Sequence, residues 1–126
     1  MPPDARELAH LRDMLDYARR VERLVTGVAY DQYLADDMRQ LAVERGLEIV
    51  GAAANRTSPE TRARYPDIPW RAIIGQRNVL AHEYGKIQQD KIWETAIRRT
   101  PVLIRQLLEI VPDNPDPGAL PWNRNL

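Results

Sequence analysis

The sequence predicts an all-α protein, an antiparallel bundle of four main helices joined by short helical turns. Apolar residues recur at helical spacing along most of the 126 residues. No segment sustains the period-two alternation of a half-buried strand, and no unit of about 20 to 50 residues repeats. Long periodic segments with short connections between them are typical of helical bundles.

The first helix is expected from about Asp4 to Thr26, and Gly27 supplies its stop. Residues 31–35 then form a short helical turn. The stripe that faces the core of the first helix consists of Leu8, Leu11, Leu15, Ala18, Val21 and Val25.

The second main helix is expected from a cap at Asp36 to about Asn55. Arg45 and Glu48 interrupt its apolar stripe, and charged residues on a core face cost free energy unless they are paired. Two interpretations stay open: a buried or half-buried ion pair, or polar support for groups on a facing helix. The inner face is assigned to Met38, Leu41, Ala42, Ile49 and Ala52.

Residues 56–69 are a connector, in which Ser58 caps a short helix and Pro59 takes its first position. The third main helix runs from Trp70 to about Tyr84, ends at Gly85, and buries Ile73, Ile74 and Leu80.

Asp90 caps the last main helix, which Pro101 kinks or divides in two. Residues 1–112 make one domain, and residues 113–126 are a proline-rich tail that Trp122 pins to the body. The core positions of the last helix are Ile92, Trp93, Ala96, Ile97, Leu103, Ile104, Leu107, Leu108 and Val111.

Charge composition restricts the kind of partner. The 18 cationic and 18 acidic residues balance, so a site for a polyanion must be a local patch. All cationic residues but Lys86 and Lys91 are arginines. Arginine binds phosphate through a planar fork, although biased codon usage explains the same composition.

Several classes of site are disfavoured by what the sequence lacks. It has no cysteine, and its two histidines fall in different predicted helices, so no metal site and no cofactor are expected. No apolar run approaches the roughly 18 residues of a membrane span, and the N-terminus lacks the apolar core of a signal peptide. We expect a cytoplasmic protein with no membrane partner.

The stretch RNVLAHEYG, residues 77–85, combines three residue types that suit RNA chemistry. If the helix continues through it, Arg77 and Tyr84 share a stripe and His82 projects to the side. Histidine, with an ordinary pKa of about 6.5, transfers protons near neutral pH, and arginine stabilises charge on a phosphate. One histidine cannot act as base and acid at once, which a two-fold dimer would solve. The alternative is an ordinary helix end, where histidine is favoured by the macrodipole and Tyr84 is a half-buried aromatic.

A longer stretch resembles a known family. YPDIPWRAIIGQRNVLAHEYGKIQQDKIWETAI, residues 65–97, is similar to the HepT-like branch of the HEPN superfamily. AVERGLEIVGAAA, residues 42–54, looks like the second long helix of that branch. These proteins are small α-helical toxins of prokaryotic toxin–antitoxin pairs, so the resemblance implies a metal-independent endoribonuclease of a type VII-like system.

The resemblance also implies roles for single residues. Arg77 and His82 match the catalytic R-x-x-x-x-H pair, and Asn78 fits the polar position after the arginine. Tyr84 matches the tyrosine to which a minimal nucleotidyltransferase antitoxin transfers AMP, which silences the toxin. Arg45 and Glu48 are supporting candidates. Family members often have an acidic residue after the glycine of the upstream helix, where this chain has Ala52.

The partners implied are an RNA substrate, the nucleotidyltransferase antitoxin in a hetero-oligomer, and a second copy of the chain, with the two motifs meeting at a cleft. Arg56, Arg62, Arg64 and Arg71 either guide RNA to that cleft or belong to a solvated connector. The alternative function is a non-catalytic helical dimer that binds a nucleotide or the partner nucleotidyltransferase. A metal-dependent hydrolase is disfavoured, because the sequence offers no cluster of ligands.

Overall fold

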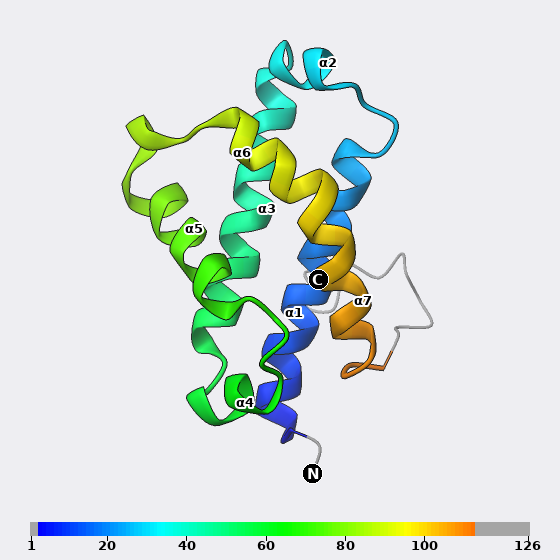
Figure 1. Ribbon diagram of the computed structural model, residues 1–126, viewed down its shortest axis with the longest axis vertical. Coiled ribbons are helices and arrows are strands. Elements are labelled where there is room, and N and C mark those ends of the chain that lie inside the picture. The colour runs from blue at the N-terminus through cyan, green and yellow to red at the C-terminus, as the bar shows by residue number, and fades with distance from the viewer. Residues whose placement is uncertain (1–2, 113–126) are drawn as a thin grey trace, which may run out of the picture.

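The computed structural model describes residues 3–112, which contain helices and turns but no strand (Figure 1). The all-α prediction is confirmed. α3 packs against α1 and α5, and α7 packs against the other side of α1. The four main helices are α1 (Ala5–Val25), α3 (Asp37–Arg56), α5 (Trp70–His82) and α7 (Thr100–Leu108). The short elements are α2 (Tyr30–Leu34), α4 (Pro59–Arg64), α6 (Gln89–Glu94), a 3-10 turn (Tyr84–Lys86) and a π-helical turn (Thr95–Arg99).

α1 follows its prediction closely. The side chain of Asp4 caps its first turn by accepting a hydrogen bond from the Glu7 backbone N–H at 2.9 Å. At the other end Gly27 has φ +76°, a conformation that L side chains rarely adopt. The predicted stripe is buried except for the half-buried Leu8, and Met14 joins it.

α3 buries a different face from the predicted one. Met38 is 82% exposed and Leu41 is 65% exposed, Ala42 is also exposed, and Ile49 and Ala52 are half-buried. The helix has two apolar stripes, and the stripe that carries Arg45 and Glu48 is turned to solvent, where those charges stay hydrated. The buried stripe is free of charge and consists of Val43, Gly46, Leu47, Val50, Gly51, Ala53 and Ala54.

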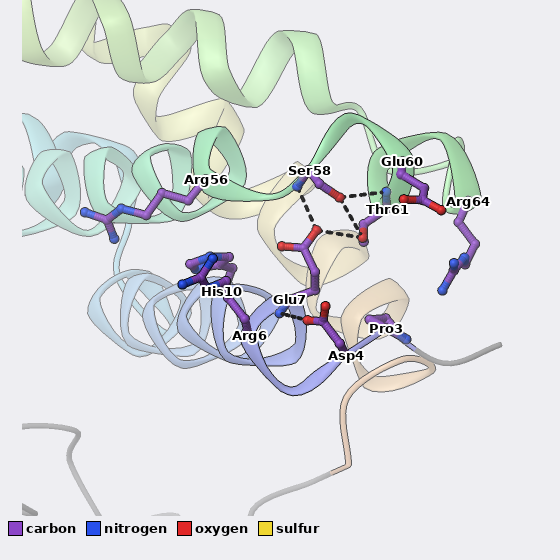
Figure 2. A pocket seen from close by; sticks show the side chains of 10 residues that line it. All are labelled: Pro3, Asp4, Arg6, Glu7, His10, Arg56, Ser58, Glu60, Thr61 and Arg64. Carbon is purple, nitrogen blue, oxygen red and sulfur yellow. Dashed lines mark hydrogen bonds between the residues drawn. The ribbon is translucent and has the colours of Figure 1, made fainter.

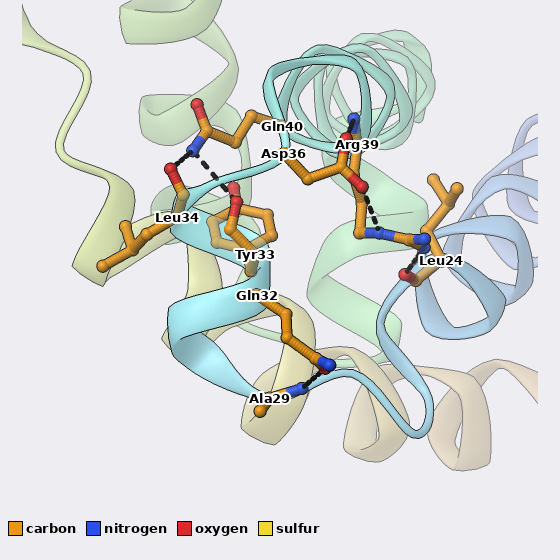
Figure 3. A network of polar contacts seen from close by, with 8 residues as sticks. All are labelled: Leu24, Ala29, Gln32, Tyr33, Leu34, Asp36, Arg39 and Gln40. Carbon is orange, nitrogen blue, oxygen red and sulfur yellow. Dashed lines mark hydrogen bonds and ion pairs between the residues drawn. The ribbon is translucent and has the colours of Figure 1, made fainter.

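Backbone carbonyls around α2 are paired by two side chains of α3 (Figure 3). The Gln40 amide donates to the carbonyls of Tyr33 and Leu34, at 3.0 and 3.1 Å. Arg39 donates to the carbonyl of Leu24 and pairs with the Asp36 carboxylate at 3.1 Å. These contacts tie the end of α1 and the end of α2 to the start of α3, so the connection between the two long helices is held by side chains as well as by its own backbone.

The connector after α3 is fastened by a buried carboxylate. Glu7 of α1 accepts hydrogen bonds from the Ser58 N–H at 2.8 Å and from the Thr61 hydroxyl at 2.7 Å. The hydrogen bonds from Ser58 and Thr61 lower the pKa of the Glu7 carboxyl below its ordinary value. The predicted helix start is confirmed, because the Ser58 hydroxyl accepts from the Thr61 N–H at 3.1 Å and Pro59 begins α4.

The last helical segment is interrupted where the sequence predicted it. Pro101 has no N–H and its ring crowds the carbonyl four residues earlier, so the preceding turn widens into the π turn and α7 begins afresh at Thr100. Two details of the prediction are wrong. Asp90 lies in the first turn of α6 rather than at its cap, and Ile97 and Leu108 are exposed.

The core consists of two clusters. The first joins α1, α3, α5 and α7 around Leu11, Met14 and Leu107. The second, around Val21, Tyr33 and Leu47, lies where α2 and α6 meet the long helices. No helix among residues 3–112 is both long and apolar enough to cross a membrane. The proposed tail, residues 113–126 with Trp122, lies outside the described residues.

Candidate functional site

The three residues of the 77–84 motif do not share one helix. α5 ends at His82, with Glu83 as its C-cap, and Tyr84 begins the 3-10 turn. The prediction that Arg77 and Tyr84 share a stripe is therefore wrong. Gly85 does not stop the helix, since the described glycine with positive φ is Gly27.

Arg77 is placed by the close approach of α5 to α3. A Cβ at Gly51 would lie 2.2 Å from the Cβ of Arg77, 2.8 Å from its Cγ and 3.1 Å from the carbonyl oxygen of Ile73. Real side chains do not tolerate such distances, so only glycine allows the two helices to meet here. The stem of Arg77 is consequently held against the backbone of α3.

The guanidinium of Arg77 has few partners in the fold. Its Nη1 donates to the Asn78 Oδ1 at 3.1 Å, which brings the two predicted residues into contact. Its Nε is buried and has no hydrogen-bond partner among residues 3–112. A buried donor of this kind is uncommon and leaves capacity for an acceptor from outside the described chain.

Arg77 lines a cavity of about 500 Å³ with both supporting candidates. Arg45 and Glu48 form an ion pair at 2.8 Å, in which the arginine side chain is mostly exposed. The predicted pairing at i, i+3 is confirmed, but it lies at the rim rather than in the core. Ala52 lines the same cavity as Arg77.

Two lining residues were missed because they come from α1. Asp13 and Tyr17 belong to the cavity, together with Ile49 and Arg56. Their signal in the sequence is a polar stripe on α1 at residues 6, 10, 13 and 17, beside the apolar one. That stripe is ordinary for an amphipathic helix, and only the packing of α1 against α3 gives it a place at this cavity.

His82 and Tyr84 lie outside the cavity. Both are exposed, and Tyr84 is 74% exposed. The side chain of neither makes a hydrogen bond or an ion pair to the rest of residues 3–112. Within one chain, therefore, the fold joins Arg77 to Asn78, Arg45 and Glu48 but does not bring His82 or Tyr84 to them.

The four arginines proposed as guides for RNA separate into different roles. Arg56 lines the cavity, whereas Arg62 donates from Nε to the Thr57 carbonyl at 2.9 Å and so supports the connector. Arg64 lies on α4 and Arg71 is exposed on α5. Among residues 3–112 no group of three or more histidine, aspartate or glutamate side chains is arranged to hold a metal ion.

Comparison with known proteins identifies relatives of this chain. Residues 14–110 match the model of the family described as ribonuclease HepT-like. A candidate RNase from Caldanaerobacter subterraneus subsp. tengcongensis is 35% identical over 91 residues, which is 72% of this chain and 80% of the relative. A candidate RNase from Methanocaldococcus jannaschii is 30% identical over 105 residues, 83% and 87% of the two chains. A probable ribonuclease HepT from Thermococcus cleftensis is 29% identical over 94 residues, 75% and 86% of the two. No solved structure matches.

The Gly51 contact is testable by adding one methyl group. Gly51→Ala places a Cβ where Arg77 already stands, so α5 must move away from α3, at a cost of about 1–3 kcal/mol. Gly75→Ala is the matched control, because the space around that glycine of α5 is open and alanine is the better helix former by roughly 1 kcal/mol. Urea unfolding should show the first variant less stable and the second at least as stable as the wild type. Equal stability of both variants would contradict the close approach.

Proposed function

Because this chain belongs to the HepT-like ribonuclease family, we propose that it is a metal-independent endoribonuclease that uses Arg77 and His82. The observation that carries the proposal is Arg77 itself, which lines the cavity and whose buried Nε lacks a partner among residues 3–112. Arginine in this setting binds a phosphate through charge-assisted hydrogen bonds. Asn78 holds one end of the fork in place.

In the proposed reaction the 2′-oxygen attacks the neighbouring phosphorus, and the bond from phosphorus to the 5′-oxygen breaks. One proton leaves the 2′-hydroxyl and one arrives at the 5′-oxygen, which gives a 2′,3′-cyclic phosphate and a 5′-hydroxyl. Arg77 stabilises the charge that develops on the phosphate oxygens. His82 transfers a proton. Its side chain is exposed at the end of α5, where RNA can reach it.

A second copy of the chain would complete the site. Met38, Leu41 and Ala42 form an exposed apolar patch at the start of α3, and the half-buried Ile49 lies two turns after Ala42 with Arg45 between them. Exposed apolar side chains grouped at helical spacing mark an association surface. Pairing of two such patches around a two-fold axis would bring the two Arg77 cavities to the same side and supply two histidines. We propose this homodimer as the active form.

Tyr84 is proposed as the acceptor of AMP from a nucleotidyltransferase antitoxin of a type VII-like system. Its side chain is exposed on the 3-10 turn, two residues after His82. Added phosphates there would repel an RNA backbone and compete for Arg77. The antitoxin would form a hetero-oligomer with the toxin.

One observation favours a second candidate function. The structure of the single chain leaves His82 outside the cavity that Arg77 lines, and Ala52 stands at the cavity wall where the resemblance implies an acidic residue. A helical dimer that binds a nucleotide or the partner nucleotidyltransferase without cleavage would need neither an acidic residue at that position nor Arg77 and His82 close together. The ribonuclease assay separates the two functions.

The catalytic assignment predicts loss of cleavage without loss of fold. Arg77→Ala and His82→Ala should each reduce the rate of RNA cleavage in EDTA by at least about 100-fold, the usual size of a lost proton-transfer or charge-stabilising group. Arg105→Ala is the control, because that arginine is exposed on α7 and does not line the cavity. Cyclic phosphate ends should be detected on the products. A wild type that cuts no RNA under these conditions would support the non-catalytic function instead.

The regulatory assignment predicts a change of mass. Co-expression with the neighbouring nucleotidyltransferase should add one or more AMP units to the wild type, and Tyr84→Phe should abolish the gain in intact mass. Tyr30→Phe serves as the control, since Tyr30 is another exposed tyrosine, on α2. AMP on the Tyr84→Phe variant would place the acceptor elsewhere.

The dimer predicts a change of molecular mass in solution. Leu41→Glu puts a charge in the middle of the exposed patch, so the variant should elute as a folded monomer where the wild type elutes as a dimer. Val102→Glu changes another exposed apolar residue, on α7, and should remain dimeric. Light scattering after size exclusion measures both. A monomeric wild type would rule out the patch as the association surface.

A further inference from the structure

A second groove lies at the far end of the α1–α3 pair, between the start of α1, the end of α3 and α4 (Figure 2). It has a volume of about 780 Å³. Arg6 and His10 line it from α1, one turn apart on the same stripe. Arg56 lines it from the last turn of α3.

This groove shares a lining residue with the Arg77 cavity. Arg56 lines both, and Figure 2 shows its guanidinium pointing back along α3, away from α4. Along α1 the polar stripe continues from Arg6 and His10 to Asp13, which is part of the Arg77 cavity. Seven steps along the helix separate Arg6 from Asp13, a distance of about 10 Å. The two hollows therefore lie in line along the seam between α1 and α3.

Two of the three carboxylates that line the second groove are engaged by the fold. Asp4 caps α1, and Glu7 is buried with its Oε1 held by Ser58 and Thr61 (Figure 2). Glu60, on α4, lines the groove together with Arg64 of the same helix. Electrostatic attraction to Glu7 is an ordinary role for His10, and it contributes to the lowered pKa of that carboxyl.

The two arginines at the seam, by contrast, are available. Arg6 and Arg56 are exposed and His10 is half-buried. The side chain of none of the three has a hydrogen bond or a close ion pair with another of residues 3–112. In a chain with zero formal net charge, Arg6 and Arg56 are two cations without a hydrogen bond or close ion pair among residues 3–112, and His10 lies beside them.

We propose that this groove, Arg6, His10 and Arg56, binds the phosphate backbone of single-stranded RNA and extends the substrate path beyond the cleavage site. The inference rests on the proposed ribonuclease function. A strand whose scissile phosphate lies at Arg77 passes Arg56 and places a following phosphate between Arg6 and His10. The proposed dimer pairs through Met38, Leu41 and Ala42 at the start of α3, whereas this groove lies at the end of α3. The groove therefore stays open in that dimer.

The path has a chemical consequence for substrate choice. Arginine and histidine contacts to phosphate carry no sequence information, so the groove favours longer strands over short ones without selecting bases. A dinucleotide reaches Arg77 alone, whereas an oligonucleotide reaches the second groove as well. Length dependence of binding is thus the property that the groove adds.

The test measures binding apart from cleavage. The probe is a 2′-O-methyl RNA of about twelve nucleotides, within the usual site size for single strands, which lacks the nucleophilic hydroxyl. Fluorescence anisotropy at several salt concentrations should show the Arg6→Ala/His10→Ala variant binding about 10-fold more weakly than the wild type. Its slope of log affinity against log salt should become shallower by about 0.7 for each phosphate that the variant no longer neutralises. Arg105→Ala, an exposed arginine of α7 outside the seam, should leave affinity and slope unchanged.

Cleavage kinetics separate the path from the catalytic proposal. Arg6→Ala/His10→Ala should raise KM for a cleavable RNA of the same length and leave kcat/KM for a dinucleotide unchanged. Wild-type affinity and slope in the double variant, or an equal loss in Arg105→Ala, would overturn the path. A wild type that binds the probe but cuts no RNA would overturn the ribonuclease function and leave the binding groove standing. A wild-type melting temperature in the double variant confirms that the Glu7 contacts are intact.

Discussion

The contact between Gly51 of α3 and the stem of Arg77 sets the distance between the two helices that carry the candidate site. α5 makes its main packing contact with α3, and this contact is closest where a side chain is missing. The same approach buries Leu80 and packs Ile73 against the core. The packing that stabilises α5 therefore also places the side chain of Arg77. A change that loosens the packing also moves the guanidinium.

The fold was largely predictable from local signals, because caps, glycine stops and apolar periodicity act over a few residues. Asp4, Ser58 and Gly27 mark their helix ends as expected. The inner face of α3 was not predictable in this way. Both of its stripes are apolar, and the choice between them depends on which one meets α1 and α5. Periodicity describes a helix but not its neighbours, so Met38 and Leu41 were assigned to the core and lie at the surface.

The site was predictable in part for the same reason. Arg45 and Glu48 are one helical turn apart, so their ion pair follows from local geometry. Arg77 and Asn78 are neighbours in the sequence and were both named by the motif. Asp13, Tyr17 and Gly51 reach the site only through tertiary packing, so no short motif contains them. The end of α5 at His82 was missed because Glu83 leaves the helix without a glycine or proline to mark it. That early end is what separates Tyr84 from the stripe of Arg77.

The π turn at Thr95–Arg99 controls the rotational phase of the last helix. Ile92, Ala96, Thr100 and Ile104 are all buried, at successive steps of four residues. In a regular α-helix each such step would rotate the side chain by about 40°, so the row would leave the core within three steps. The wider turn compensates for this rotation, so the buried residues of α6 and α7 stay on one face of the helical segment. Residues 95–99 thus work as a spacer that accommodates one extra residue while Leu103 and Leu107 stay buried.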